Sequence, residues 1–117
     1  MSKSQRTKGS VAEREAGKLI VKHLGGSCLR TPNSGGLAIK GDLHPNGNAL
    51  EGWHLECKRQ ERISLGAWME QARGDAGAKP WLLMHRRNNE RWKVTLEADD
   101  FFGVLAELQA YWEKESE

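Results

Sequence analysis

The sequence predicts an α/β domain in which helices pack against a mixed central β-sheet. Three stretches repeat their apolar residues every three or four positions, which is the spacing of an amphipathic helix. Between them lie short apolar or alternating runs of strand length, separated by turn residues. The resulting order is helix, β-hairpin, helix, strand, strand, helix, which is typical of helices layered on a sheet. The 117 residues can form one compact domain but not two.

The first helix is expected at residues 9–24 and directs one carboxylate toward the interior. Ser10 and Glu13 have the spacing of a capping box, and two glycines follow residue 24. At about 100° per residue, Glu13 projects close to Ile20, at the edge of the apolar stripe. That stripe contains Ala12, Ala16, Leu19, Ile20 and Leu24. Residues 1–7 are expected to form a flexible basic arm, and residues 8–117 a single domain.

Three strands are expected between the first and second helices. Residues 27–31 and 37–45 are the first two, and Asp42 lies near the end of the second. An Asn-Gly turn within residues 46–52 indicates a hairpin to the third strand, at residues 53–59. Alternation along this third strand separates its side chains onto two faces. One face carries Trp53, Leu55 and Cys57, and the other carries His54, Glu56 and Lys58.

The rest of the chain is expected to form a helix, two strands and a last helix. Residues 64–76 have an apolar stripe and begin with a cap candidate, Ser64. Residues 80–86 form a continuous apolar run, of the kind that is buried on both faces of a sheet. In the alternating run 91–96, the residues expected to face the core are Trp92, Val94 and Leu96. The last helix, 99–114, has a stripe of Phe101, Val104, Leu105, Leu108 and Trp112.

Composition and charge exclude several classes of protein. Mean hydropathy is −0.71, and no apolar run approaches the ~18 residues of a membrane span. The N-terminus lacks the apolar segment of a secretory signal, which favours a cytoplasmic location. The two cysteines make no disulfide framework. Residues 1–62 hold eleven basic and six acidic residues, whereas residues 63–117 hold seven and ten, so the first half favours a polyanion partner.

A group of charged residues is expected to meet at the predicted hairpin. Pairing of its two strands would bring Asp42 close to Glu56, and adjacent carboxylates are costly without a cation. Their oxygen ligands suit Mg²⁺, with Mn²⁺ as a substitute, rather than zinc. The backbone carbonyl of Cys57 is a further candidate ligand, and Lys58 supplies a cation on the strand face of Glu56. A metal ion, a water molecule and a lysine together fit phosphodiester hydrolysis.

These residues resemble a known nuclease pattern. Asp42 followed by Glu56-Cys57-Lys58 resembles the D…(D/E)xK signature of the restriction-endonuclease-like (PD-(D/E)xK) nucleases. The segment K-G-S-V-A-E-R-E, at residues 8–15, is similar to the N-terminal K-G-x-x-x-E-R-E motif of the archaeal-type Holliday junction resolvases, which also occur in phages. The similarity covers roughly residues 8–96. Gly41, which precedes the aspartate, departs from the usual residue of the family.

The resemblance implies a restriction-endonuclease-like core with an added C-terminal helix, and it implies roles for individual residues. The implied catalytic residues are Glu13, Asp42, Glu56 and Lys58. The implied metal ligands are Asp42, Glu56 and the Cys57 carbonyl, with Glu13 bound directly or through water. The expected contacts to DNA are Arg6, Lys8, Arg14, Arg30, Ser34, Lys40 and Arg59. The auxiliary candidates are Gln71 and His54.

The resemblance also implies a substrate and a partner. The protein would be a Mg²⁺-dependent endonuclease that resolves four-way (Holliday) junctions by paired, symmetric phosphodiester hydrolysis. It would act as a homodimer, whose two-fold symmetry matches that of the junction. Its location would be the cytoplasm of a bacterial or archaeal cell, or of a phage-infected host. The last helix is an addition to the family core that could build the dimer or cover a sheet face.

Each site residue also has a simpler structural explanation, so other functions stay open. Glu13 can be a capping residue alone, and Asp42 a turn aspartate. Glu56 and Lys58 can form an exposed ion pair on an edge strand. One alternative function is a different nuclease of the same superfamily, for restriction, nicking or repair. The other is a module that binds DNA junctions without catalysis.

Overall fold

The computed structural model describes residues 3–31 and 41–116, with side chains from residue 9 onward within these ranges. These parts form three helices and five strands, which confirms the predicted α/β class. The helices are α1 (Lys3–Leu24), α2 (Leu65–Ala76) and α3 (Ala98–Glu115). The strands are β1 (Ser27–Arg30), β2 (Leu43–Asn46), β3 (His54–Arg59), β4 (Trp81–Arg86) and β5 (Lys93–Thr95).

The five strands form one mixed sheet in the order β1-β2-β3-β4-β5. Strands β1, β2 and β3 are antiparallel neighbours, β3 and β4 are parallel, and β5 is antiparallel to β4. Between β3 and β4, α2 provides the crossover that a parallel pair requires. The predicted hairpin between the second and third strands is present, although its ladder consists of one residue pair, Leu43 with Leu55.

Two apolar cores lie on the two faces of the sheet, one under α1 and the other under α2. The first joins Ala12, Ala16 and Ile20 of α1 to Leu43, Leu55, Cys57, Leu82 and Met84. The second joins Trp68, Ala72 and Ala76 of α2 to Trp81 and Leu83. Because strand side chains alternate between faces, β3 and β4 are buried on both sides, as the apolar run at 80–86 predicted. Leu55 and Cys57 therefore face α1, whereas His54 and Glu56 face α2.

The first helix is longer than predicted. It begins at Lys3, within the segment 1–7 that was expected to be a flexible basic arm. No strong helix breaker lies between Lys3 and Gly9, and a glycine inside a helix costs only about 1 kcal/mol. Ser10 consequently lies inside the helix, and its predicted capping box with Glu13 is wrong.

The second strand begins later than predicted. β2 starts at Leu43, and residues 32–40 of the predicted strand and its preceding loop lie outside the described structure. Gly41 has a φ of 93°, a conformation that residues with side chains rarely adopt and that interrupts an extended strand. Asp42 therefore precedes β2 instead of lying near the end of a strand.

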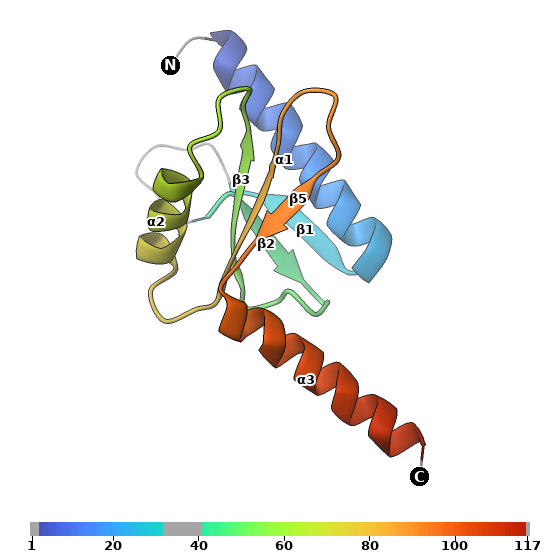
Figure 1. Cartoon of the computed structure of the whole chain (residues 1–117). Helices are drawn as coiled ribbons and strands as arrows, with labels where there is room; N and C mark the ends of the chain where they lie inside the picture. Colours follow the sequence, from blue (N-terminus) through green and yellow to red (C-terminus); the bar gives the residue numbers. More distant parts are fainter. Residues whose placement is uncertain (1–2, 32–40, 117) are drawn as a thin grey trace.

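The last strand and the last helix are more exposed than their sequence patterns predicted. Trp92 packs against the core under α1, as predicted, but Val94 is 54% exposed, so its predicted inward orientation is wrong. The reason is that β5 is an edge strand, while α1 contacts β1, β2 and β3 toward the other edge. After β5, α3 extends away from the sheet (Figure 1), and the chain reaches 57 Å in its longest dimension. Among the described residues, no helix combines the length and apolar character needed to cross a membrane.

Candidate functional site

The edge of β3 that faces Asp42 is the centre of the candidate site. In the described part of the chain, pairing between β2 and β3 is limited to Leu43 and Leu55. Beyond that pair, Oδ2 of Asp42 accepts a 2.7 Å hydrogen bond from the backbone N–H of Cys57. The backbone N–H of Asp42 donates to the Leu55 carbonyl at 2.8 Å, which fixes the aspartate against the strand. Because the N–H and C=O of one strand residue point toward the same neighbouring strand, the Cys57 carbonyl lies along the edge that Asp42 occupies.

Asp42 and Glu56 form a carboxyl pair beside this edge. Burial, followed by the negative charge of Glu56, raises the pKa of Asp42 to about 6, although the hydrogen bond from Cys57 opposes the shift. Burial also raises the pKa of Glu56, while a hydrogen bond from Asp42 and the positive charge of Lys58 oppose that increase. Glu56 is only 3% exposed. The pair therefore retains a proton to higher pH than separate carboxyl groups would, and a bound cation would release that proton.

Glu13 of α1 is a third carboxylate near the pair. Its Oε2 accepts a 2.9 Å hydrogen bond from Nε of Arg30, at the end of β1. Burial raises the pKa of Glu13, the hydrogen bond from Arg30 opposes this increase, and the negative charge of Asp42 adds to it. Glu13 is therefore half-buried, directed toward the sheet and within electrostatic range of Asp42, rather than acting as a helix cap.

Lys58 completes the predicted group. It shares the strand face of Glu56, as alternation predicted, and its side chain is half-buried. Its positive charge lowers the pKa of both Asp42 and Glu56. The four predicted residues Glu13, Asp42, Glu56 and Lys58 thus come together from α1, from the turn before β2, and from β3.

A second group of possible metal ligands shares Glu56. Ligand atoms of His54, Glu56 and Asp75 all lie within 4.8 Å of one another. Nε2 of His54 is 2.7 Å from Oε1 of Glu56, so this auxiliary candidate contacts the site directly. Gln71, the other auxiliary candidate, is exposed on α2, and it is Asp75 that α2 places beside Glu56. Asp75 was not predicted as a site residue, because no motif or strand spacing connects the last turn of α2 to Glu56.

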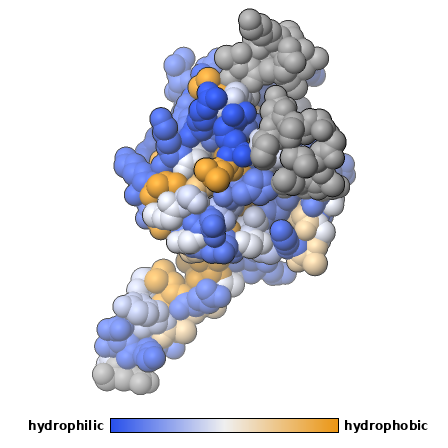
Figure 2. All heavy atoms as spheres, turned by 180° about the vertical axis from the view of Figure 1, so that it is seen from behind, coloured by the Kyte–Doolittle hydropathy of each residue, from blue (hydrophilic) through white to orange (hydrophobic). Residues whose placement is uncertain are grey.

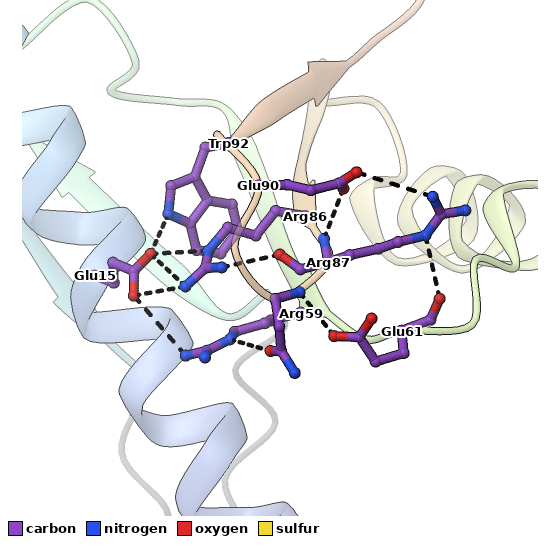
Figure 3. Close-up of polar contacts among 8 residues, drawn as sticks. Glu15, Arg59, Glu61, Arg86, Arg87, Glu90 and Trp92 are labelled. Carbon is purple, nitrogen blue, oxygen red and sulfur yellow. Dashed lines mark hydrogen bonds and ion pairs between the residues drawn. The ribbon is translucent and has the colours of Figure 1, made fainter.

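A cluster of ion pairs centred on Glu15 joins α1 to the ends of β3 and β4 (Figure 3). Arg86 donates from Nε and Nη2 to the two carboxylate oxygens of Glu15, at 2.9 and 3.1 Å. Nε1 of Trp92 donates to the same carboxylate at 2.7 Å, and the Arg86 guanidinium lies 5.3 Å from the centre of the Trp92 ring. Arg86 is buried, so Glu15 compensates a charge that has little access to water. The cluster fixes the position of α1 two residues from Glu13.

The predicted DNA contacts differ in how free their side chains are. Arg30 is paired with Glu13, and Nε of Arg59 donates to Oδ1 of Asn88 at 3.1 Å. Arg14 is exposed on α1. Four further predicted contacts lie outside the described residues or have side chains outside them: Arg6, Lys8, Ser34 and Lys40.

The carboxylates at the β3 edge fit a divalent cation. Three of them lie buried or half-buried within electrostatic range of one another, and a cation would remove the cost of ionising them together. Asp42, Glu56 and the Cys57 carbonyl offer the oxygen ligands that Mg²⁺ and Mn²⁺ accept. The imidazole of His54 would extend the ligand set toward transition metals. This arrangement, with Lys58 beside it, can support hydrolysis of a phosphate ester.

Comparison with known proteins identifies a family but no individual relative. A family model described as "Phage putative PDDEXK endonuclease" matches residues 4–116. The matched range contains Asp42 and the Glu56-Cys57-Lys58 tripeptide, and it continues through α3. No curated protein and no solved structure matches the chain. The mixed sheet flanked by helices is consistent with the fold that such a family implies.

Proposed function

The chain belongs to the family of phage putative PDDEXK endonucleases, and we propose that it is a Mg²⁺-dependent DNA endonuclease that resolves four-way junctions. The observation that carries the nuclease proposal is the meeting of Asp42 and Glu56 at the edge of β3, held by the hydrogen bond from Cys57. The junction specificity is supported by the resemblance of residues 8–15 to the resolvase motif.

The proposed metal ligands are Asp42, Glu56 and the Cys57 carbonyl, with Glu13 bound directly or through water. When bound, the metal would act as a Lewis acid toward the scissile phosphate. The chain holds both carboxylates in place: Cys57 donates to Asp42, and His54 contacts Glu56 at 2.7 Å. Fixed partners of this kind orient metal ligands and maintain affinity. Mn²⁺ is expected to substitute for Mg²⁺, because it accepts the same ligands.

Lys58 is proposed to act on the attacking water and on the phosphate. Its ammonium group can donate a hydrogen bond to the water oxygen or to a phosphate oxygen on which negative charge develops. In the reaction, the water oxygen forms a new P–O bond, the bond to the leaving oxygen breaks, and the leaving oxygen takes up a proton from solvent water. Glu13, whose pKa is raised by burial, is a suitable acceptor for the proton that the water loses.

Branched DNA is the proposed substrate, and a homodimer is the proposed active form. Two sites related by a two-fold axis would cut two opposed strands of a junction. Arg14 is exposed on the helix that carries Glu13 and is suited to bind a phosphate. Arg30 and Arg59 already have partners within the chain, so they would contribute mainly to the positive potential around the site.

The test is cleavage of a labelled four-way junction beside a linear duplex and a splayed arm of the same sequences, in Mg²⁺ and in EDTA. We expect paired, symmetric nicks in the junction alone, and their loss in EDTA. Equal cutting of all three substrates would support a nuclease but reject junction specificity. Tight junction binding without cutting would reject catalysis and support a DNA-binding module.

A further inference from the structure

The exposed apolar face of α3 is a candidate interaction surface. Every residue from Phe101 to Glu115 is exposed, and the helix extends away from the sheet (Figure 1). Figure 2 shows apolar side chains along this helix. Its large apolar residues are between 40% and 61% exposed: Phe101, Phe102, Val104, Leu105, Leu108, Tyr111 and Trp112. A helix with this much exposed apolar surface is typical of an interaction site rather than of a solvated face.

Four of these residues form a regular seam along α3. Phe101, Leu105, Leu108 and Trp112 are separated by four, three and four positions, which is the alternation of core positions in a coiled coil. At about 100° per residue, their side chains project within a sector of about 60°. Ala106 and Ala110 project away from this sector. The regular spacing indicates that the partner of this face is another α-helix.

The seam is self-complementary about the middle of the helix. Leu105 and Leu108 are equally distant from the peptide bond between residues 106 and 107, and so are Phe101 and Trp112. Two antiparallel copies of α3 would therefore place Leu105 opposite the partner's Leu108. They would also place Phe101 opposite the partner's Trp112. The two central layers would each pair leucine with leucine, and the two outer layers would each pair one aromatic ring with another. A surface that matches itself under a two-fold rotation is the requirement for a symmetric dimer.

The helix dipole favours this antiparallel arrangement over a parallel one. Antiparallel helices place the positive end of one macrodipole beside the negative end of the other, whereas parallel helices place like ends together. Side-chain charge does not distinguish the two orientations, because the first turn carries Asp99 and Asp100 and the last turn carries Lys114 between Glu113 and Glu115.

The size of the helix is compatible with a specific interface. Its 18 residues span about 27 Å at 1.5 Å per residue. A specific interface buries roughly 800 Å² on each partner. The aromatic residues of the seam, Phe101 and Trp112, are 45% and 61% exposed, so pairing can newly cover about half of the roughly 150–250 Å² that an aromatic side chain buries when fully covered. With Leu105 and Leu108, they supply part of the area of such an interface.

We propose that α3 is a dimerisation helix that pairs in antiparallel orientation with α3 of a second copy of this chain. The inference rests on the homodimer of the proposed function and names its interface, but it does not rest on the nuclease activity, because none of the residues that carry it belongs to the candidate metal site. A dimer without cleavage activity would reject the nuclease alone, whereas cleavage by a monomer would reject both the pairing of α3 and the proposed active form.

The first experiment measures the mass of the full chain by light scattering and sedimentation over a series of concentrations. We expect a dimer of the 13.1 kDa chain. The double variant Leu105→Lys/Leu108→Lys removes the central layers and should raise the dimer dissociation constant at least about 100-fold, because charges would be buried without partners. The matched control, Ala106→Lys/Ala110→Lys, adds the same charge outside the seam and should remain dimeric. The four substituted positions are exposed, so circular dichroism should show an intact fold in both variants.

The second experiment tests the orientation by disulfide cross-linking. Chains carrying Phe101→Cys are mixed with chains carrying Trp112→Cys, oxidised, and separated on a non-reducing gel. The unaltered chain, treated in the same way, gives the background from Cys28 and Cys57. We expect cross-links in the mixture and not in Phe101→Cys alone, because antiparallel pairing separates the two copies of position 101 by about 16 Å along the axis.

Three outcomes would overturn the proposal. A chain that stays monomeric at all concentrations has no α3 pair. A Leu105→Lys/Leu108→Lys variant that dimerises as well as the unaltered chain places the interface elsewhere. Strong cross-linking of Phe101→Cys with itself shows a parallel pair instead.

Discussion

The backbone N–H of Cys57 donates a 2.7 Å hydrogen bond to Oδ2 of Asp42, and so joins one site carboxylate to the strand that carries the other. Among the described residues, Leu43 pairs with Leu55, and Asp42 lies beside the next part of the β3 edge. The position of Asp42 therefore depends on the edge of β3 as well as on its own turn. This relationship explains how a tripeptide on one strand and an aspartate before another can form one site.

The substitution Asp42→Asn should abolish cutting while the chain keeps its fold. Asparagine retains a side-chain oxygen that can accept the hydrogen bond from Cys57, but it lacks the charge that a divalent cation needs. We expect a loss of at least about 10³-fold in the rate of nicking, since the ligand set of the metal is broken. Binding to the junction, measured by gel shift in Ca²⁺ or EDTA, should change less than about threefold, because phosphate contacts dominate affinity.

A matched control for this variant is Asp99→Asn, which removes the same charge from exposed α3 and should leave cutting unchanged. Nicking by Asp42→Asn at the rate of the unaltered chain would rule out Asp42 as a metal ligand.

Without divalent cations, the chain should lose stability as the pH rises through the range of about 4 to 6. Burial and the charge of Glu56 raise the pKa of Asp42 from 3.8 to about 6, so the folded chain holds this proton more tightly than the unfolded chain. This contribution is fully present below the unfolded pKa and is lost as the pH rises through about 6. The raised pKa values of Glu13 and Glu56 act in the same direction.

The measurement is the free energy of unfolding in urea with EDTA, at intervals from pH 4 to pH 8. The loss of stability across this range should be about 1–2 kcal/mol smaller in Asp42→Asn than in the unaltered chain, after allowance for solvent screening. Added Mg²⁺ should restore stability above pH 6, because it binds the ionised pair. Identical pH profiles for the two chains would show that Asp42 ionises normally in the fold.

The substitution Lys58→Met should separate metal binding from catalysis. Methionine keeps an unbranched apolar chain in a half-buried position, but it removes the cation beside the two carboxylates. We expect a loss of about 10²–10³-fold in nicking rate, since a donor aimed at developing charge is removed. Mg²⁺ affinity, measured by calorimetry, should be retained or should increase, because Lys58 competes with the metal for the same charges. Weaker Mg²⁺ binding together with normal cutting would contradict the proposed role.

Local sequence patterns predicted where the helices and strands lie better than they predicted which faces of these elements are covered in the fold. The bounds of α2, β3, β4 and α3 are close to those predicted, because each has a run of apolar residues with one clear period. The alternating run 91–96 does form a strand, but alternation cannot show that Val94 lies at a sheet edge that α1 does not reach. In the same way, the stripe of α3 predicted a helix with an apolar face but not what covers that face.

The candidate site was predictable where its residues are linked by a motif or a hairpin. Asp42 and Glu56 meet because the turn between them returns the chain to the same sheet edge. The contact between Glu15 and Arg86 spans 71 positions of sequence, and Asp75 reaches Glu56 from a helix on the opposite face to α1. Such contacts depend on how helices are placed on a sheet, and one sequence carries no spacing that encodes this placement.

The substitution Glu15→Ala should destabilise the fold and weaken the site indirectly. Glu15 compensates the buried Arg86 and accepts a hydrogen bond from Trp92, so its loss leaves a charge and a donor without their partner. We expect a decrease of about 2–4 kcal/mol in the free energy of unfolding, measured in urea. Glu70→Ala, on the exposed face of α2, is the control and should change stability by less than about 0.5 kcal/mol. A decrease of the same small size for Glu15→Ala would show that Arg86 finds another partner or water.

The substitution Asp75→Asn should reduce metal affinity without removing the metal ligands at the β3 edge. His54, Glu56 and Asp75 lie within 4.8 Å of one another, so the charge of Asp75 acts on the carboxylate that both ligand groups share. Removing an outer partner of a metal ligand typically costs about 10–100-fold in affinity, and we expect a loss in this range for Mn²⁺, measured by calorimetry. Asn keeps the size of the side chain, and Asp75 is half-buried, so the melting temperature in EDTA should change by only a few degrees.

Comparison of Asp75→Asn with Asp42→Asn distinguishes the two ligand groups. Asp42, at the β3 edge, should be required for nicking at any metal concentration. The nicking defect of Asp75→Asn should instead diminish as the Mn²⁺ concentration is increased. A variant with unchanged Mn²⁺ affinity would show that Asp75 has no influence on the ion that Glu56 binds.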